Sequence, residues 1–486
     1  MSDTPKQAKT HIAGGVELEA KGSEYFEKRQ LQGGVAGWVL LAGLGVAYVI
    51  SGDFAGWNFG LGEGGWGGLL IATILMATMY LFMVFGLAEL SSTISTTGGG
   101  YAFARRAMGP WGGFLTGTAI LIEYAIAPAA IANFIGAYVN SLIGIDGWVV
   151  YLFFYVIFIG LHLFGVGEAL KVMFAITAVA VFALIVFVVA AIPQFDAANL
   201  TDIPVDTAAT GASSFLPFGY IGIWAALPYA IWFFLAVEGV PLAAEESKNP
   251  AKDMPKGIIA AMLALIVFAG LILLTAPGAA GSAFLMESGN PLVEALEAPE
   301  AYGEQTLVSQ FVNVVGLLGL IASFFSIIYA YSRQTFALSR AGYLPKWLSV
   351  TGKRKTPTMA LIVPGIIGFV MAVMNQGDLL ILVAVFGATI SYIMMTLSHI
   401  ILRIKEPDLE RPYRTPGGVV TTGIALVLAV VALIAGFLVD TRVLTITAGV
   451  FVVAIAYFGL YSRHHIVGTA PEEEFALIES AESELH

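Results

Sequence analysis

Apolar runs of about 20 residues recur along most of this chain, and a helix of that length crosses the hydrocarbon core of a bilayer. Backbone polar groups cannot stay unpaired in that core, so a chain with many such runs must form helices there. Only 12% of the residues are charged, about half the share in soluble domains. The sequence therefore predicts an all-α integral membrane protein. The runs lie at about 34–58, 66–90, 112–141, 147–165, 168–192, 218–243, 257–277, 306–332, 357–375, 378–402, 418–439 and 443–462.

The lysines and arginines support a count of twelve transmembrane helices. If every run crosses the bilayer, all 23 basic residues except Arg442 fall on one side. Basic residues collect in cytoplasmic loops, so we expect a multi-pass protein of the cell (inner or cytoplasmic) membrane with both termini in the cytoplasm. The first 32 residues lack the apolar core of a secretory signal, so we expect the first helix to direct insertion.

Composition also excludes several classes of site. The chain has no cysteine, which rules out disulfides, thiolate metal sites and cysteine nucleophiles. A net charge of -11 with no basic cluster gives no footprint for nucleic acid. No histidine and serine stand in an arrangement typical of a nucleophile with its base. We therefore expect no enzyme, no cofactor and no metal site, and we interpret His464 and His465 as surface residues.

The first run is interrupted near its middle by Ser51, Gly52 and Asp53. An aspartate at the centre of a membrane helix costs roughly 2.5 to 3.5 kcal/mol on insertion scales, so it usually has a partner or a water-filled cavity. Irregular backbone at that depth is tolerated only where it is buried in protein or lines a cavity. We therefore predict a helix that is broken around a binding site, with Asp53 as the counter-charge of a cation.

The sixth run is interrupted in its own way over residues 234–241, where Glu238, Gly239 and Pro241 stand together. The simpler interpretation is a kinked helix whose one acidic side chain, Glu238, reaches the membrane–water interface. Two interrupted helices five apart instead indicate a five-plus-five inverted repeat with its site at the midplane. The predicted divisions are a cytoplasmic N-terminal segment at 1–32, a first repeat at 33–192, a second repeat at 218–403, two further helices at 417–462 and a cytoplasmic acidic tail at 463–486.

Two long connections, 193–217 and 278–305, carry eight acidic residues and no basic residue. Acidic residues contribute little to topology, so we interpret these connections as solvated loop surface. The alternative is an acidic vestibule that enriches cations outside the membrane.

Three polar connections resemble those of the amino acid-polyamine-organocation (APC) transporters. They are Thr97–Pro110 after the second run, Ala244–Pro250 after the sixth and Arg333–Trp347 after the eighth. The resemblance covers about residues 30 to 465 and implies a leucine-transporter-type fold with discontinuous first and sixth helices and alternating access. Within this family the chain is most similar to the ethanolamine permeases, through Ile50–Phe54 and a comparable sixth helix.

The charge at the break separates this chain from typical members of that family. The resemblance implies a glycine-rich break whose backbone N–H groups receive a substrate carboxylate. Asp53 stands close to that place and would repel a carboxylate, because like charges at short range in a low dielectric cost several kcal/mol. We therefore expect a secondary transporter that imports ethanolamine or a closely related small amine.

The other candidate residues keep more than one interpretation. Glu238 is a substrate contact or a partner for freed backbone N–H groups, and Glu123 is a substrate contact, a proton carrier or a hydrogen-bond partner between helices. Aromatic faces attract ammonium groups, although most aromatic residues in so apolar a chain pack in the core. The predicted substrate-binding residues are Ile50, Ser51, Gly52, Asp53, Phe54, Glu123, Tyr124, Trp232, Phe233, Phe234 and Glu238.

The coupling ion stays open between a proton, sodium and none. The fold that the resemblance implies would place sodium between first-helix carbonyls near Val46 and Ile50 and the hydroxyls of Ser323 and Ser326. Some proton-coupled relatives have a lysine in the fifth helix, where this chain has Ala180. Two rival functions also stay open: an amino acid transporter or antiporter in which Asp53 faces away from the pocket, and a membrane amine sensor without transport. The oligomeric state is open as well.

Overall fold

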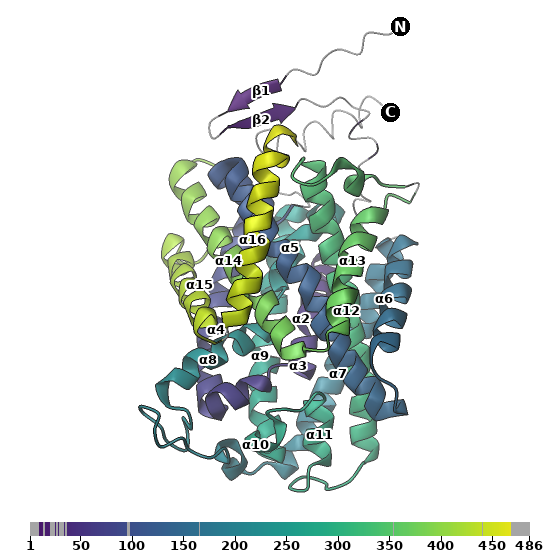
Figure 1. Ribbon diagram of the computed structural model, residues 1–486, viewed down its shortest axis with the longest axis vertical. Helices are drawn as coiled ribbons and strands as arrows, with labels where there is room; N and C mark the ends of the chain where they lie inside the picture. Colours follow the sequence, from purple (N-terminus) through teal and green to yellow (C-terminus); the bar gives the residue numbers. More distant parts are fainter. Residues whose placement is uncertain are drawn as a thin grey trace.

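The computed structural model describes residues 9–12, 15–19, 25, 28, 34, 36–94, 98–164, 166–352, 354–439 and 441–467. Most of the predicted acidic tail at 463–486 lies outside the described residues, as does most of the segment 1–32. The described part is a bundle of helices with a small sheet at one end (Figure 1). We call this the sheet end, and the opposite end, where α10 (Ser282–Leu285) and α11 (Pro291–Glu297) lie, the α10 end.

Apolar helices occupy all the places where the sequence predicts membrane runs. Within the described residues, nine are long and apolar enough to cross a membrane, and three shorter apolar helices stand where the first, fourth and ninth runs were predicted. The three are α2 (Trp38–Val49), α6 (Trp148–Leu163) and α13 (Thr358–Val373). The nine are α4 (Phe59–Thr93), α5 (Gly100–Ile143), α7 (Val166–Ala191), α8 (Gly219–Trp232) with η3 (Val237–Glu246), α9 (Pro250–Ala280), α12 (Leu307–Arg340), α14 (Gly377–Lys405), α15 (Val419–Val439) and α16 (Thr441–Leu460).

Burial separates inner helices from outer ones. In its most apolar stretch, α5 has 83% of its residues buried and α14 has 78%, whereas α15 has 28% and α16 only 17%. A helix that is buried on all sides must find protein partners for its polar groups, whereas an outer helix can face lipid. The inner helices α5, α12 and α14 therefore carry the candidate polar site, together with the broken helices packed against them.

The remaining elements are short. A single helical turn, α3 (Ser51–Phe54), follows α2, and 3-10 turns join several of the longer helices. These turns are η1 (Ile192–Gln194), η2 (Ala197–Thr201), η4 (Lys346–Ser349) and η5 (Ser462–His464).

A three-stranded sheet at the sheet end was not predicted. β1 (Lys9–Ile12) pairs antiparallel with β2 (Val16–Glu19), and β2 pairs parallel with β3 (Ile466–Val467). Val16 and both residues of β3 are buried. Within the described residues, the only β-strands are those of this cap. The pairing of β2 with β3 joins opposite ends of the chain, and a local sequence pattern cannot predict a pairing partner so far away in the sequence.

The connection after the second run is more helical than predicted. α5 begins at Gly100, within the polar connection, and bends at Gly109, whose φ of +75° lies in the left-handed region. Pro110 follows the bend, where its missing N–H costs least because the first residues of a helix have no intrahelical acceptor for theirs. The predicted membrane run at 112–141 is the part of α5 after this bend.

Candidate functional site

The first helix is interrupted one turn later than predicted. α3 keeps Ser51–Phe54 in a helical turn, and the backbone leaves the helix at Ala55, with φ -162° and ψ 159°, and at Gly56, with φ +96°. The prediction that the chain unwinds at residues 51–53 is therefore wrong in register. Gly52 serves close packing instead, because a side chain there would collide with the carbonyl of Trp232, whereas Gly56 supplies the positive φ that the break needs.

The second interruption lies where the sequence predicted it. α8 ends at Trp232, Ala236 has a left-handed φ of +79°, and the chain resumes as the 3-10 helix η3. The two interruptions touch each other, since Trp232 Nε1 donates a hydrogen bond to the carbonyl of Ala55 at 3.0 Å. Two segments about 180 positions apart in the sequence thus form one irregular region inside the bundle.

Asp53 is buried beside the first interruption without compensation. Its side chain is 1% exposed, and neither carboxyl oxygen has a hydrogen-bond partner among the residues that the structure describes. A buried charge without a partner is costly and is rarely kept for stability. The carboxyl group therefore remains available for a positive ligand or a proton.

The other two predicted acids form a separate pair. Glu123 in α5 and Glu238 in η3 are both buried and lie close enough for their charges to interact, and Oε2 of each has no hydrogen-bond partner among the described residues. Tyr124 Oη donates to Glu238 Oε1 at 3.1 Å, and Tyr392 Oη lies 3.5 Å from Glu123 Oε1. Two adjacent carboxylates repel each other unless a proton or a cation lies between them. This pair is therefore a second place that can hold one positive charge.

The predicted aromatic residues divide between the two places. Phe234 packs on Tyr80, with ring centroids 5.5 Å apart, and Tyr80 Oη donates to Tyr392 Oη at 2.7 Å beside the carboxyl pair. Phe233 stacks on Trp57 at 5.7 Å near the first interruption. Phe233 and Phe234 contact each other, with ring centroids 6.2 Å apart, so a continuous series of rings connects the two places.

Phe54 packs between helices, against α12. Its ring lies where a side chain on Gly316 or Gly319 of α12 would be, and its carbonyl accepts a hydrogen bond from Tyr138 Oη at 3.1 Å. The space freed by these two glycines is therefore already filled. The contacts of Phe54 are those of a core residue.

The space at the first interruption is closed in this conformation. A narrow gap lined by Tyr48, Val49, Ser51, Trp232, Leu235 and Ile327 is too small for a water molecule. Asp53 does not line this gap. Any cargo must therefore enter through a rearrangement of the helices.

The predicted sodium ligands are only partly brought together. Ser323 Oγ of α12 lies 2.8 Å from Ser51 Oγ and donates to the carbonyl of Tyr48 at 2.7 Å, so this hydroxyl does reach the first helix. Ser326 instead bonds to the carbonyl of Ala322 within α12 and to Met173 Sδ of α7 at 3.2 Å. The carbonyls of Val46 and Ile50 accept backbone N–H groups from their own helix.

A buried ion pair at the sheet end was missed as a site feature. Arg333 of α12 and Glu246 of η3 are 1% exposed and 2.7 Å apart, and Tyr329 donates a hydrogen bond to the same carboxylate. Backbone hydrogen bonds hold Ala36, just before α2, to Glu246 and Lys248. Glu246 and Arg333 both lie in the polar connections that carry the family resemblance. No local sequence pattern shows that their side chains contact each other. Together these contacts close the bundle toward the sheet end.

The α10 end is closed by different contacts. Asn58, between the first interruption and α4, donates to the carbonyls of Leu285 and Ser288 at 2.7 and 2.8 Å. Trp66 Nε1 donates to the carbonyl of Leu273 at 2.8 Å. Hydrogen-bonded contacts thus lie on both sides of the two interruptions.

The acidic connections at the α10 end use several of their carboxylates locally. Asp196, Asp202 and Asp206 each accept a backbone N–H at 2.9 to 3.0 Å, as expected of turn and cap residues. Burial raises the pKa of Glu294 in α11, and Glu297 nearby adds to the shift. These contacts explain part of the acidic composition without a vestibule.

The comparisons with known proteins agree with this architecture. A sequence profile described as amino acid permease matches residues 38–461. An uncharacterized transporter of Rhizobium meliloti (strain 1021) is 30% identical over 81% of this chain and 85% of its own. The branched-chain amino acid permease BcaP of Bacillus subtilis (strain 168) is 26% identical over 82% of this chain and 86% of its own.

A further relative, the methylthioribose transporter of Bacillus subtilis (strain 168), is 28% identical over 72% of this chain and 76% of its own. Permeases move solutes across membranes and are not enzymes, in agreement with the prediction of a transporter. Because the profile match spans nearly the whole helical bundle, the chain belongs to the amino acid permease family.

Proposed function

We propose that this permease is a secondary transporter for a small amine, ethanolamine or a close chemical relative. The observation that carries the proposal is Asp53, a buried carboxyl group with no partner in the described structure. An ammonium group would compensate this charge, whereas a carboxylate at the same place would meet repulsion of several kcal/mol. Cargo with a positive charge and no acid group fits the site best.

The distribution of buried charge supports the same cargo. Asp53, Glu123 and Glu238 all lie inside the bundle, whereas the buried Arg333 is already paired with Glu246. An interior with spare negative charge attracts cations and excludes anions. Trp57 and Phe233 add aromatic faces near the first interruption, and such faces favour desolvated ammonium groups.

Alternating access is proposed as the mechanism. The two interruptions lie five helices apart in the sequence and touch through Trp232 and Ala55, as expected of repeats 33–192 and 218–403 around one site. In this proposal α2, α6 and α13 also cross the membrane, which gives twelve transmembrane helices. The protein lies in the cell membrane with its sheet end facing the cytoplasm. Opening toward the sheet end would separate Ala36 from Glu246, and opening toward the α10 end would separate Asn58 from Leu285.

The coupling ion has two candidate places. The carboxyl pair of Glu123 and Glu238 would hold a proton, and the oxygens of Ser51, Ser323 and Tyr48 would hold sodium. Vesicles with purified protein and separately imposed proton and sodium gradients distinguish the two, because only the coupled ion would drive accumulation of the amine.

Amino acid transport is the second candidate, and two observations favour it. Asp53 does not line the narrow gap at the first interruption, and one relative is named a branched-chain amino acid permease. Another relative is named for methylthioribose, which is neither an amine nor an amino acid. The named substrates thus differ among relatives of similar sequence identity to this chain. Family membership therefore does not fix the substrate, and the residues at the site must determine it.

Uptake of radiolabelled ethanolamine into proteoliposomes tests the proposal, with alanine, glutamate and choline as competitors and protein-free vesicles as the control. We expect excess unlabelled ethanolamine to compete and alanine and glutamate not to compete. Competition by carboxylated compounds only would reject the charge argument. Binding of ethanolamine without accumulation in the vesicles would instead identify a sensor.

A further inference from the structure

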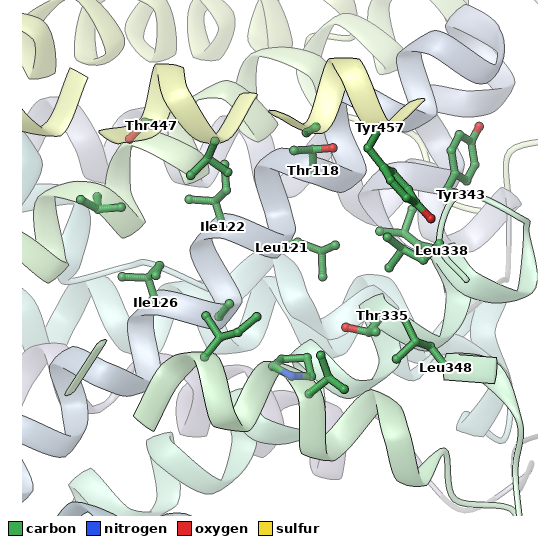
Figure 2. Close-up of a pocket in the computed structure, with 18 of the residues that line it drawn as sticks. Thr118, Leu121, Ile122, Ile126, Thr335, Leu338, Tyr343, Leu348, Thr447 and Tyr457 are labelled. Carbon is green, nitrogen blue, oxygen red and sulfur yellow. The ribbon is translucent and has the colours of Figure 1, made fainter. Parts of the chain in front are cut away.

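A cavity of about 490 Å³ lies apart from the two interruptions, between the inner helices α5 and α12 and the outer helices α13 and α16 (Figure 2). Its volume is within the range of small-molecule binding sites. α5 separates the cavity from the acids, because this helix contributes Glu123 to the carboxyl pair and Ile122 and Ile126 to the cavity wall. The proposed transport site uses no part of this cavity.

The shape of the cavity follows the helices. Tyr343 and Leu348, which follow α12, lie at its sheet end together with Tyr457 near the end of α16, whereas Thr447 lies toward the other end (Figure 2). Thr447 and Tyr457 are ten positions apart in one helix, which corresponds to about 15 Å along its axis. The cavity is therefore long and narrow, and it begins near one boundary of the apolar bundle.

The wall is apolar and opens toward the outside of the bundle. Ile367 of α13 and Ile446 and Val450 of α16 line the cavity and are 48, 38 and 43% exposed. α16 is the least buried of the long helices, so in a bilayer its outer face meets lipid. An apolar cavity of this kind does not hold water well. Hydrocarbon is the material that surrounds its opening.

Three hydroxyl groups in the wall, those of Thr335, Thr447 and Tyr457, have no hydrogen-bond partner among the described residues. The side chain of Thr335 in α12 is 3% exposed, and its hydroxyl has no hydrogen-bond partner in the described part of the chain. A buried hydroxyl without a partner costs free energy, and an acceptor from a ligand would recover it. Thr335 stands five positions before the end of α12, toward the sheet end of the cavity (Figure 2).

We propose that this cavity binds one acyl chain of a membrane lipid. The chain lies along α16 against the apolar wall, and the ester carbonyl of the lipid accepts the hydrogen bond of Thr335. Length, a mostly apolar lining, an opening to the bilayer and free hydroxyl donors at the sheet end, Thr335 and Tyr457, suit an acyl ester, whereas the hydroxyl of Thr447 lies toward the other end. The bound chain fills the gap between α16 and α5 and thereby supports the helix that carries Glu123.

Two matched variants of α16 test the binding. Ala454 lines the cavity, whereas Ala456, two positions on, is exposed. Purified protein is incorporated into vesicles of phosphatidylethanolamine and phosphatidylglycerol that contain a phospholipid with a photoreactive acyl chain, and the labelled peptides are identified by mass spectrometry. We expect Ala454→Phe to lower labelling of α16 and α5 about tenfold, the size of an ordinary overpacking effect, and Ala456→Phe to leave it unchanged.

A third variant keeps the test decisive if Ala454→Phe fails to fold. Thr335→Val preserves the shape of the side chain and removes the donor, so we expect labelling at the cavity to fall about fivefold, as for one lost hydrogen bond. Equal labelling in wild type and Thr335→Val, or equal loss in Ala454→Phe and Ala456→Phe, would overturn the proposal. Labelling does not depend on the cargo, so this result is independent of the proposed transport of amines.

Discussion

Two buried carboxyl groups of this permease have opposite surroundings. Glu89, near the end of α4, is 1% exposed and contacts Arg403 at 2.5 and 2.6 Å, Arg411 at 2.9 Å and His399 at 3.3 Å, and it also accepts the backbone N–H of Thr415. Asp53 is equally buried, and its carboxyl oxygens have no partner in the described residues.

This difference separates a structural acid from a candidate functional one. The contacts of Glu89 hold α4 to α14 and to the connection before α15, so its charge is part of the folded state. The charge of Asp53 stabilises no contact within the described chain, which fits its proposed role as the partner of an ammonium group. Burial alone would have ranked the two residues alike.

The largest expected effect on stability is at Glu89. Glu89→Gln removes the charge and leaves two arginines without their partner, so we expect a loss of about 3 to 5 kcal/mol in the free energy of unfolding. Thermal unfolding of the purified protein in detergent measures it. Glu406→Gln is the control, because the pair with Arg106 is partly exposed and is worth about 0 to 1 kcal/mol. If Glu89→Gln and Glu406→Gln both lower the free energy of unfolding by a similar small amount, Glu89 is not the structural acid that we infer.

The same type of change at Asp53 should affect function instead. Asp53→Asn keeps the size of the side chain and removes a charge that no described residue compensates. We therefore expect the free energy of unfolding to be unchanged or slightly higher. Affinity for the amine should fall about 100-fold, equivalent to about 3 kcal/mol, as measured by isothermal calorimetry. An unchanged affinity would show that Asp53 is not the ammonium partner.

Close packing beside Asp53 gives the next effect. A side chain on Gly52 meets the carbonyl of Trp232, so Gly52→Ala should cost about 1 to 3 kcal/mol by overpacking. Gly270 in α9 has open space around it, and Gly270→Ala should be neutral or stabilising by up to about 1 kcal/mol. Thermal unfolding compares the two. A loss of the same size at both positions would contradict the contact between the interruptions.

The smallest effect concerns the two serines of α12. Ser323→Ala removes hydrogen bonds to Ser51 and Tyr48, so it should cost about 1 kcal/mol. Ser326→Ala removes a bond within its own helix and a weak one to the thioether of Met173, so it should cost less. If sodium binds at Ser323, the sodium concentration for half-maximal uptake will rise in Ser323→Ala only. Equal shifts in both variants would restore the predicted two-serine site.

Local sequence patterns predicted much of the framework. Hydrophobic runs located the helices, because apolar length is a property of each segment alone, and glycine, proline and acids within runs located the two interruptions to within one turn. The polar connections with their basic residues led to the same family that the comparisons show. Asp53, Glu123 and Glu238 could be named because an acid in an apolar run is expensive wherever it stands.

Only the tertiary structure decided which of these residues meet. Glu123 pairs with Glu238, while Asp53 stands apart. Ser323 reaches the first helix and Ser326 does not, and Gly52 packs while the neighbouring Gly56 turns the chain. The cap formed by β2 and β3 was invisible for the same reason. Contacts between segments hundreds of positions apart depend on how the helices approach in space, and a single sequence records the side chains but not their distances.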